Sequence, residues 1–335
     1  MTVPDDAWHI YRGTGEPNDR IGTLPPPPPW RGFDPDPDPG DEPPFVPETR
    51  DKEHRAGLRY RPDPQTVELV NAALYLRRPL LVTGAPGTGK STLATAIAHE
   101  LNLGRALRWN ITSRATLRDG LYQYDPLARL YAASRRDDDP AADPDEDLGR
   151  YLRLGPLGTA LLPRRRPRVL LIDEVDKADL DLPNDLLTIF EDGEFEIAEL
   201  LRRPEQHAHT LVSTIDSPQR VGVRDGRVRC SRFPIVVMTS NDEREFPPAF
   251  LRRCVQVRIE TPDERKLQQI VEAHLPDMAP DSAAVIRQFL AGQKAGGLAT
   301  DQLLNAIYLV HAARLDRDKT REALAAVVMT PLVRR

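Results

Sequence analysis

The eight residues GAPGTGKS at positions 84–91 constrain the fold of this 335-residue chain more than any other feature. They fit the pattern G-x-x-x-x-G-K-[ST] of a phosphate-binding loop, which joins a strand to a helix. The apolar run at 80–83 predicts the strand, and TLATAIAHEL at 92–101 predicts the helix. With both flanks in place, a chance Gly-rich turn is a poor alternative. The sequence therefore predicts an α/β fold with a parallel sheet flanked by helices.

Each loop residue has a chemical reason to be there. The glycines let the backbone fold around phosphate oxygens, while amide N–H groups and the helix N-terminus supply positive potential. The Lys90 ammonium would reach the β- and γ-phosphates, and the Ser91 hydroxyl would ligate Mg²⁺. The predicted nucleotide-binding residues of the loop are Gly84, Ala85, Pro86, Gly87, Thr88, Gly89, Lys90, Ser91 and Thr92.

A second apolar strand, RVLLIDEVD at 168–176, ends in acidic residues. A carboxylate at the carboxyl end of a parallel strand lies beside the phosphate loop, so Asp173 is expected to hold Mg²⁺ directly or through water. Glu174 projects the other way and could polarise a water molecule aimed at the γ-phosphate. Kinases that use a bound substrate as nucleophile need no such Glu, so the pair favours hydrolysis.

A third apolar strand, IVVMTSN at 235–241, ends at Asn241, and Arg252 and Arg253 follow about a helical turn beyond Pro248. From residue 263 onward the pattern changes to helices alone. The expected helical stretches are DERKLQQIVEAHL, DSAAVIRQFLAG, TDQLLNAIYLVHAAR and KTREALAAVV. Strands alternating with helices, followed by helices alone, predict an α/β domain with a small helical domain attached.

Together, GAPGTGKS, LLIDEVD, VVMTSN and FPPAFLRRC, followed by a helical tail, resemble an AAA+ ATPase. LLIDEVDKAD, LPNDLL and SNDEREFPPAFLRRC resemble the MoxR-type members of that superfamily, and the likeness covers roughly residues 60–330. The resemblance implies a nucleotide-binding domain at 58–260, a helical lid domain at 261–335, and ATP with Mg²⁺ as cofactors. Asn241 matches the sensor 1 position, where its amide would orient the attacking water or touch the γ-phosphate.

The resemblance also implies that Arg252 and Arg253 stand where a neighbouring subunit contributes an arginine finger. A contact supplied in trans requires a head-to-tail interface, which closes into a ring, by family likeness a hexamer. One or both arginines could instead form salt bridges within the chain, and which one is the finger stays open. The family often places a basic residue, called sensor 2, at the start of a helix in the lid domain. Here Asp301 and Gln302 stand near that position and Lys294 lies several residues earlier. Either Lys294 takes the place of the basic residue, or the lid of this chain carries no sensor.

Three functions follow from these residues. The leading hypothesis is a chaperone-like ring ATPase that remodels or assembles a partner protein, as MoxR-type proteins do beside von Willebrand A domain partners or in bacterial conflict systems. A nucleotide-gated scaffold with little turnover is the alternative. A GTPase of the McrB kind or a nucleic-acid translocase is disfavoured, because the net charge is −5, the pI is about 5.9 and no aromatic-basic surface is evident.

The ends of the chain and the cysteines add less. Thirteen of the 33 prolines fall in residues 1–50, so residues 1–57 are expected to be a disordered acidic tail, with Trp30 and Phe33 as its only apolar handles for a partner. No apolar run long enough to cross a membrane occurs, which favours a cytoplasmic protein. Cys230 and Cys254 are expected to be reduced, with no metal partners.

Two further segments have alternative readings. RVGVRDGRVRC at 220–230 predicts a hairpin around Asp225-Gly226, and the resemblance suggests that its arginines, Arg224, Arg227 and Arg229, face the pore of the ring or a partner. A solvated hairpin face explains them equally well. EDGEFEIAEL at 191–200 is either a family insertion with Phe195 and Ile197 on one face, or simple core packing.

Overall fold

The computed structural model describes residues 8–33, 57–135, 148–179, 181–202, 209–296 and 298–313, together with Ala325, Val328 and Met329. Its centre is a five-stranded sheet in the order β11-β1-β10-β5-β2, with every neighbouring pair parallel. The strands are β1 (Leu80–Thr83), β2 (Leu107–Asn110), β5 (Val169–Asp173), β10 (Ile235–Ser240) and β11 (Val255–Arg258). The predicted α/β fold with a parallel sheet is confirmed.

The central strands are apolar at successive positions because helices cover both faces of the sheet. Leu80 and Val82 of β1 pack on one face, and Leu81 packs on the other. The first face is covered by α2 (Pro64–Leu76) and α3 (Lys90–Glu100), the second by α6 (Pro156–Ala160), α7 (Asp181–Asp192) and α9 (Pro248–Leu251). This two-sided burial is what fixes the carboxyl ends of the strands relative to one another.

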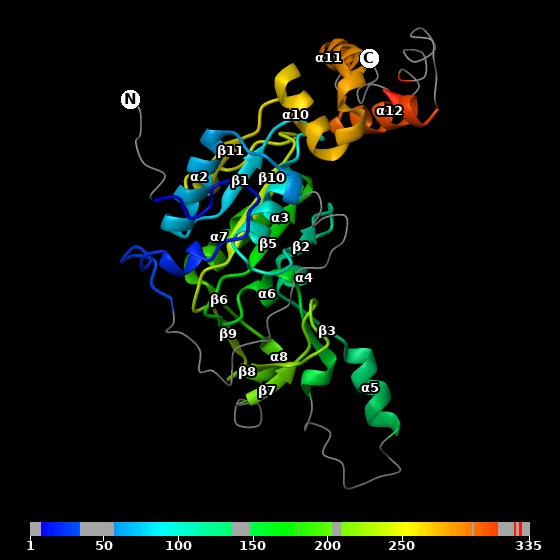
Figure 1. Ribbon diagram of the computed structural model, residues 1–335. Helices are drawn as coiled ribbons and strands as arrows, with labels where there is room; N and C mark the ends of the chain where they lie inside the picture. The colour runs from blue at the N-terminus through cyan, green and yellow to red at the C-terminus, as the bar shows by residue number, and fades with distance from the viewer. Residues whose placement is uncertain are drawn as a thin grey trace.

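A second sheet, with the antiparallel order β6-β9-β8-β7, lies below the parallel one in Figure 1, at the end of the molecule away from α11 and α12. Its strands are β6 (Glu194–Glu196), β7 (His209–Val212), β8 (Val221–Arg224) and β9 (Arg227–Arg229). The predicted hairpin is confirmed, since Asp225 and Gly226 join β8 to β9 with φ of 50° and 65°. Positive φ at both central residues is the signature of a type I′ turn.

Two arginines of this hairpin form ion pairs with glutamates of the neighbouring strand β6. Arg227 meets Glu196 at 2.8 Å and Arg229 meets Glu194 at 3.3 Å, across the β6–β9 register. On the other face Phe195 and Ile197 are buried in the main core, as the core-packing alternative expects.

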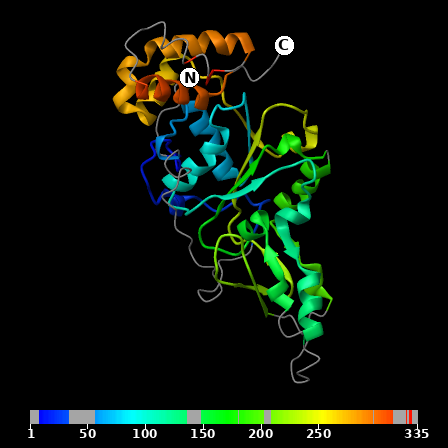
Figure 2. The same cartoon turned by 90° about the vertical axis from the view of Figure 1, so that its right-hand side faces the viewer.

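Smaller elements connect these two sheets. The hairpin of β3 (Tyr122–Tyr124) and β4 (Leu152–Leu154) is entered through α4 (Leu117–Leu121), and α5 (Pro126–Arg135) projects from it at the lower end of Figures 1 and 2. The 3₁₀ turns η4 (Leu148–Tyr151) and η5 (Val175–Lys177) precede β4 and follow β5, and α8 (Ala198–Leu201) follows β6.

The C-terminal helices form a separate layer at the opposite end from α5 (Figures 1 and 2). They are α10 (Glu264–His274), the 3₁₀ helix η6 (Pro276–Asp281), α11 (Ala283–Gly296) and α12 (Thr300–Ala312). Leu267, Phe289 and Leu303 centre a core of their own, so three predicted helices form the expected helical unit. The fourth, at 319–328, lies outside the described residues except for Ala325 and Val328.

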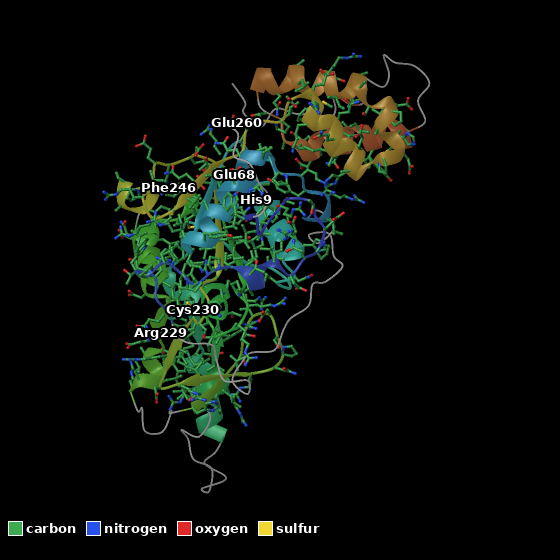
Figure 3. The ribbon with its side chains drawn as sticks, turned by 60° about the vertical axis from the view of Figure 1, so that its left-hand side comes forward. His9, Glu68, Arg229, Cys230, Phe246 and Glu260 are labelled. Carbon is green, nitrogen blue, oxygen red and sulfur yellow. The ribbon has the colours of Figure 1, made fainter. Side chains whose placement is uncertain are left out.

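The N-terminal segment corrects the expectation of a disordered tail. Residues 8–33, which include the 3₁₀ turn η2 (Arg20–Thr23), pack on the α/β domain, and Ile10 and Tyr11 are buried against α2. His9 and Glu68 accordingly lie on the same side of the molecule in Figure 3. The other residues of the expected tail, 1–7 and 34–56, lie outside the described residues.

Two buried polar side chains hold this segment. The Asn71 side chain accepts hydrogen bonds from the backbone N–H groups of Ile10 and Tyr11 at 2.7 and 3.0 Å, and donates to the Tyr11 carbonyl. The carboxylate of Glu100, fully buried, accepts from the N–H groups of Arg12, Gly13 and Gly15. Proline content alone misjudged the segment, because satisfied backbone groups and a few apolar anchors offset its ordering entropy.

Candidate functional site

The carboxyl ends of three parallel strands bring the predicted site residues together. In the sheet register Thr83 of β1 pairs with Ser240 of β10, and Asn110 of β2 pairs with Asp173 of β5. Strand β10 lies between β1 and β5, so the loop after β1 and the carboxylate of β5 flank the strand that ends at Asn241. All the loops that follow these strands therefore open onto one edge of the sheet.

The phosphate-binding loop has the backbone that its glycines permit. Gly84, Gly87 and Gly89 have φ of 144°, 74° and 88°, a region that side chains with a Cβ rarely adopt. The buried Lys90 ammonium folds back to donate to the carbonyls of Gly84 and Ala85 at 2.7 and 2.9 Å. The ammonium is therefore enclosed by the loop that is predicted to bind phosphates.

Lys90 also reaches across to the next strand. Its ammonium donates to Oδ1 of Asn241 at 2.8 Å, joining the two residues predicted to meet the γ-phosphate. Burial lowers the pKa of Lys90, and the carboxylates of Asp176, Asp242 and Asp173 partly oppose that shift. A partly desolvated ammonium gains more from a bound polyphosphate than an exposed one does.

The Ser91 hydroxyl donates to Oδ1 of Asp173 at 2.7 Å, so the two predicted Mg²⁺ ligands are in contact. Thr239 donates to the same oxygen at 2.7 Å and accepts from the Glu174 N–H at 2.8 Å. Burial raises the pKa of Asp173, but hydrogen bonds from Ser91 and Thr239 and the charge of Arg108 outweigh it, and the net shift is downward. The carboxylate is therefore held ionised, the form in which it can bind a cation.

Arg108 of β2 is a site residue that the sequence did not reveal. Its guanidinium lies 2.6 Å from Oδ2 of Asp173, and its Nε donates to Oδ1 of Asn110 at 2.7 Å. Arg108, Glu174 and Arg244 line a pocket of about 790 Å³ at this edge of the sheet. A positive charge thus already neutralises the carboxylate that would receive a metal ion.

Glu174 has a strained backbone with φ of 61°, in the left-handed region that a non-glycine residue enters at a cost. Its side chain is 42% exposed and its Oε2 accepts from the Lys177 ammonium at 2.7 Å. Asp173 and Glu174 both line the pocket at this edge of the sheet, and the opposite projection of the two carboxylates stays a prediction.

The loop after β10 is held by a buried carboxylate that sequence reasoning passed over. Oδ2 of Asp176 accepts from the N–H groups of Asn241 and Glu243 at 2.9 and 3.2 Å. Asp176 is only 3% exposed. It thereby fixes the backbone from which the Asn241 amide projects. Asp176 is the last residue of LLIDEVD, so its acidic character was visible, but its contact with a loop sixty-five residues away was not.

The helical lid touches the phosphate-binding loop directly. A Cβ on Gly87 would stand 2.5 Å from the Cβ of Ala299, just before α12, so only glycine fits here. The ring of Tyr60 lies against Gly89. The predicted place of a lid-borne sensor is therefore near the loop, but the side chain of Lys294 lies outside what the structure describes, and its role stays a prediction.

Arg252 and Arg253 do not join this cluster. They precede β11, whose first residue Val255 pairs with Leu80 at the beginning of β1, whereas the phosphate-binding loop follows the end of β1. The two arginines therefore lie at the amino end of the parallel sheet. Arg253 donates to Oε1 of Glu191 at 2.8 Å, while Arg252 is exposed and its guanidinium bonds to none of the described residues.

The residues present fit a nucleotide-bound Mg²⁺ better than a metal held by protein alone. Within the described ranges, no group of three or more His, Cys, Asp or Glu side chains could hold an ion. One hydroxyl and one carboxylate in contact, Ser91 and Asp173, are what Mg²⁺ needs when phosphates and water supply its remaining ligands. Cys230 and Cys254 are both buried and form no disulfide within the described residues, and no helix built from those residues could span a membrane.

Two known proteins are similar to parts of this chain. A protein from Corynebacterium kroppenstedtii, described as an AAA ATPase forming ring-shaped complexes, is 33% identical over 98 residues, which is 28% of this chain and 17% of the relative. The chain thus spans under a fifth of that relative's length. A crystal structure of the FIGL-1 AAA domain in complex with ADP aligns over 77% of this chain and 73% of its own, at 14% identity and a TM-score of 0.35, too low to support an argument.

The family profile described as AAA domain (dynein-related subfamily) matches residues 79–254, which is 176 of the 335 residues. The matched range contains the phosphate-binding loop, the Asp173-Glu174 pair, Asn241 and both arginines. The chain belongs to the dynein-related subfamily of AAA domains, the P-loop proteins of the AAA+ class.

Proposed function

We propose that this protein binds ATP with Mg²⁺ and hydrolyses it in a homo-oligomeric ring, and that the cycle remodels or assembles a partner protein. The observation that carries the proposal is the convergence of four predicted residues in two contacts, Lys90 with Asn241 and Ser91 with Asp173. A cation in contact with an amide, and a hydroxyl in contact with a carboxylate, at the same edge of the sheet support the proposal.

Each residue has a distinct part in the reaction. The loop amides and Lys90 bind and orient the phosphates, and Ser91 with Asp173 would hold the Mg²⁺, which withdraws charge from the β- and γ-phosphate oxygens. Glu174 accepts the proton of the attacking water, after its carboxylate leaves Lys177 or shares it. The Asn241 amide orients that water, because Asp176 fixes its backbone.

Arg252 is the residue we assign as the arginine finger, acting on the nucleotide of the neighbouring subunit. Arg252 lies at the amino end of the sheet, and four residues of extended β1 separate that end from the loop by roughly 10 Å or more. An arginine in this place serves a second subunit more readily than its own. Arg253 is instead the positioning residue, because its ion pair with Glu191 ties the end of α9 to α7.

A head-to-tail contact of this kind repeats until it closes, which supports a ring, and the Corynebacterium relative is described as ring-forming. We extend the proposal to a MoxR-type hexamer with a lid domain at 261–335, acting on a client that carries or works beside a von Willebrand A domain. The Glu174–Lys177 ion pair favours a second candidate, a nucleotide-gated scaffold in which the base is held away from water and turnover is low.

The test is ATP hydrolysis per subunit as a function of protein concentration, measured beside light scattering with ATP and Mg²⁺. The proposal expects activity to rise as the mass rises, and expects Glu174→Gln to bind ATP while losing turnover. A wild-type protein that forms the ring, binds ATP and hydrolyses no faster than Glu174→Gln establishes the scaffold instead. Concentration-independent activity of a monomer contradicts the trans arrangement.

A further inference from the structure

The amino end of the parallel sheet holds a pocket that the nucleotide chemistry does not use. Its walls come from the turns that lead into β1, β5 and β10, from α2, and from the N-terminal segment around η2. Its volume is about 270 Å³, room for a compact ligand rather than a full nucleoside triphosphate. Because the strands are parallel, this pocket and the phosphate-binding loop lie at opposite ends of the same sheet.

The rim of the pocket is strongly cationic. Five arginines line it, and none of the lining residues is acidic, although the chain as a whole carries a net charge of −5. The five arginines are Arg77, Arg78, Arg165, Arg166 and Arg232. Arg166 forms an ion pair of 3.1 Å with the exposed Asp19, which lies outside the lining. Five guanidinium groups around one concavity raise the local positive potential and attract an anion.

Arg77 shows that this charge is not simply solvated. Its residue surface is 9% exposed, and its guanidinium donates to the carbonyls of Leu74, Tyr75 and Pro25, which fix its position. Burial, together with the neighbouring charge of Arg232, lowers the pKa of Arg77 to about 10. The guanidinium is therefore pre-organised, still protonated at neutral pH, and placed where a negative charge would be stabilising.

Apolar side chains also line the pocket. Ile21 and Leu24 come from the N-terminal segment, Phe233 precedes β10, and Ile235 is the first residue of β10. Arg31 pins the segment beside the pocket, since its guanidinium donates to the Arg77 carbonyl at 2.6 Å and lies 4.9 Å from the centre of the Phe233 ring. A ligand here would meet both guanidinium groups and hydrocarbon.

We propose that this pocket binds a small organic phosphate, a phosphate monoester whose body is an apolar group about the size of one ring. Guanidinium groups match phosphate oxygens in forked pairs better than they match a single carboxylate oxygen of a bulky acid, and the apolar side chains select an ester over inorganic phosphate. The site is independent of ATP hydrolysis and needs no residue of the nucleotide site.

The experiment is isothermal titration calorimetry of the full-length protein with phenyl phosphate, in saturating Mg²⁺ and ADP so that the phosphate-binding loop is occupied. Phenol and inorganic phosphate are the two ligand controls. The proposal expects phenyl phosphate to bind at least tenfold more tightly than either control. If phenol binds as tightly as phenyl phosphate, the pocket recognises only apolar groups. If inorganic phosphate binds as tightly, the pocket is only a cationic patch. Either result, or a failure of phenyl phosphate to bind at all, overturns the proposal.

A pair of double variants locates the binding. Arg166→Gln with Arg232→Gln removes two exposed rim charges, and the expected result is a loss of about tenfold or more in phenyl phosphate affinity. The matched control, Arg227→Gln with Arg229→Gln, removes the same charge from the antiparallel sheet and should leave the affinity unchanged. An equal loss in both variants, or in neither, contradicts the assignment, and the ligand comparison on wild-type protein stands whether or not a variant folds.

Discussion

The two ends of the parallel sheet are built from the same strands but from different chemistry. At the carboxyl end, glycines, carboxylates and a strained Glu174 form loops that leave their strands at unusual backbone angles. At the amino end, Pro79, Pro167 and Pro234 precede or lead into the strands, and arginines precede these prolines. One end carries the residues proposed to hold a cation and move protons, and the other is rich in proline and arginine.

The difference is what supports the proposed ring. In the proposal the carboxyl end binds phosphates, and the exposed Arg252, which would complement their charge, stands at the amino end of the same subunit. On this account the amino end of a second subunit brings that charge to the phosphates. The comparison of the two ends therefore separates variants that should lose ATP affinity from variants that should lose ATP turnover.

Arg252→Ala should give the largest effect, a fall in ATP turnover of about 10³-fold with ATP affinity nearly unchanged, because the guanidinium stabilises charge only in the transition state. Arg253→Ala is the matched comparison. Its pair with Glu191 is 45% exposed, and such a pair contributes at most about 1 kcal/mol, so turnover should fall by only several-fold. Steady-state ATP hydrolysis is measured for both variants. A larger loss of turnover for Arg253→Ala than for Arg252→Ala would make Arg253 the arginine finger.

Lys90→Ala should come next, with ATP affinity reduced by about 10²-fold, because the variant loses charge-assisted hydrogen bonds to two phosphates. Fluorescence anisotropy of a labelled ATP analogue measures the loss. Arg229→Ala removes one positive charge from the antiparallel sheet and should leave the affinity within about twofold. If Lys90→Ala binds ATP as the control does, the carboxyl end of the sheet is not the nucleotide site.

Arg108→Gln should have a smaller and opposite effect. Arg108 neutralises Asp173 before any metal binds, so its removal should lower the Mg²⁺ concentration needed for half-maximal ADP binding. The Arg108 side chain is 41% exposed, which limits the pair to about 1 kcal/mol, or roughly fivefold. The measurement is a Mg²⁺ titration at fixed ADP. An increased Mg²⁺ requirement would instead make Arg108 a phosphate ligand.

Glu100→Ala should change stability while leaving nucleotide affinity within about twofold. Removing the carboxylate leaves three partly buried N–H donors of the N-terminal segment without their acceptor, at a cost of about 2–4 kcal/mol in the free energy of unfolding. Urea unfolding gives the change, and limited proteolysis of residues 8–33 shows whether the segment is released. Release should also abolish phenyl phosphate binding, since that segment forms one wall of the pocket.

The carboxyl end of the sheet was readable from the sequence, because its residues follow apolar strands at fixed spacing. GAPGTGKS and LLIDE place Lys90, Ser91 and Asp173 without any knowledge of packing. Thr239 and Arg108 were missed because each acts through a contact between strands far apart in sequence, and a threonine or arginine in a strand carries no signature by itself.

The arginine-lined pocket at the amino end of the sheet could not be predicted from the sequence. The run RRRPR at 164–168 has the composition of an ordinary loop, and Arg77, Arg78 and Arg232 are spread over more than 150 residues. They meet only because parallel strands begin at the same edge of a sheet. The N-terminal segment was misjudged for a related reason, since the carboxylate that anchors it, Glu100, belongs to a helix 85 to 88 residues away.

The most direct test of the account mixes two inactive variants. Glu174→Gln and Arg252→Ala are combined without nucleotide, so that subunits exchange, and hydrolysis is then started with ATP and Mg²⁺. In a mixed ring an Arg252→Ala subunit keeps its own Glu174 and receives Arg252 from a Glu174→Gln neighbour, so the mixture should recover activity that neither variant has alone. A mixture that forms rings and stays inactive contradicts the proposal that the two ends of the sheet meet between subunits.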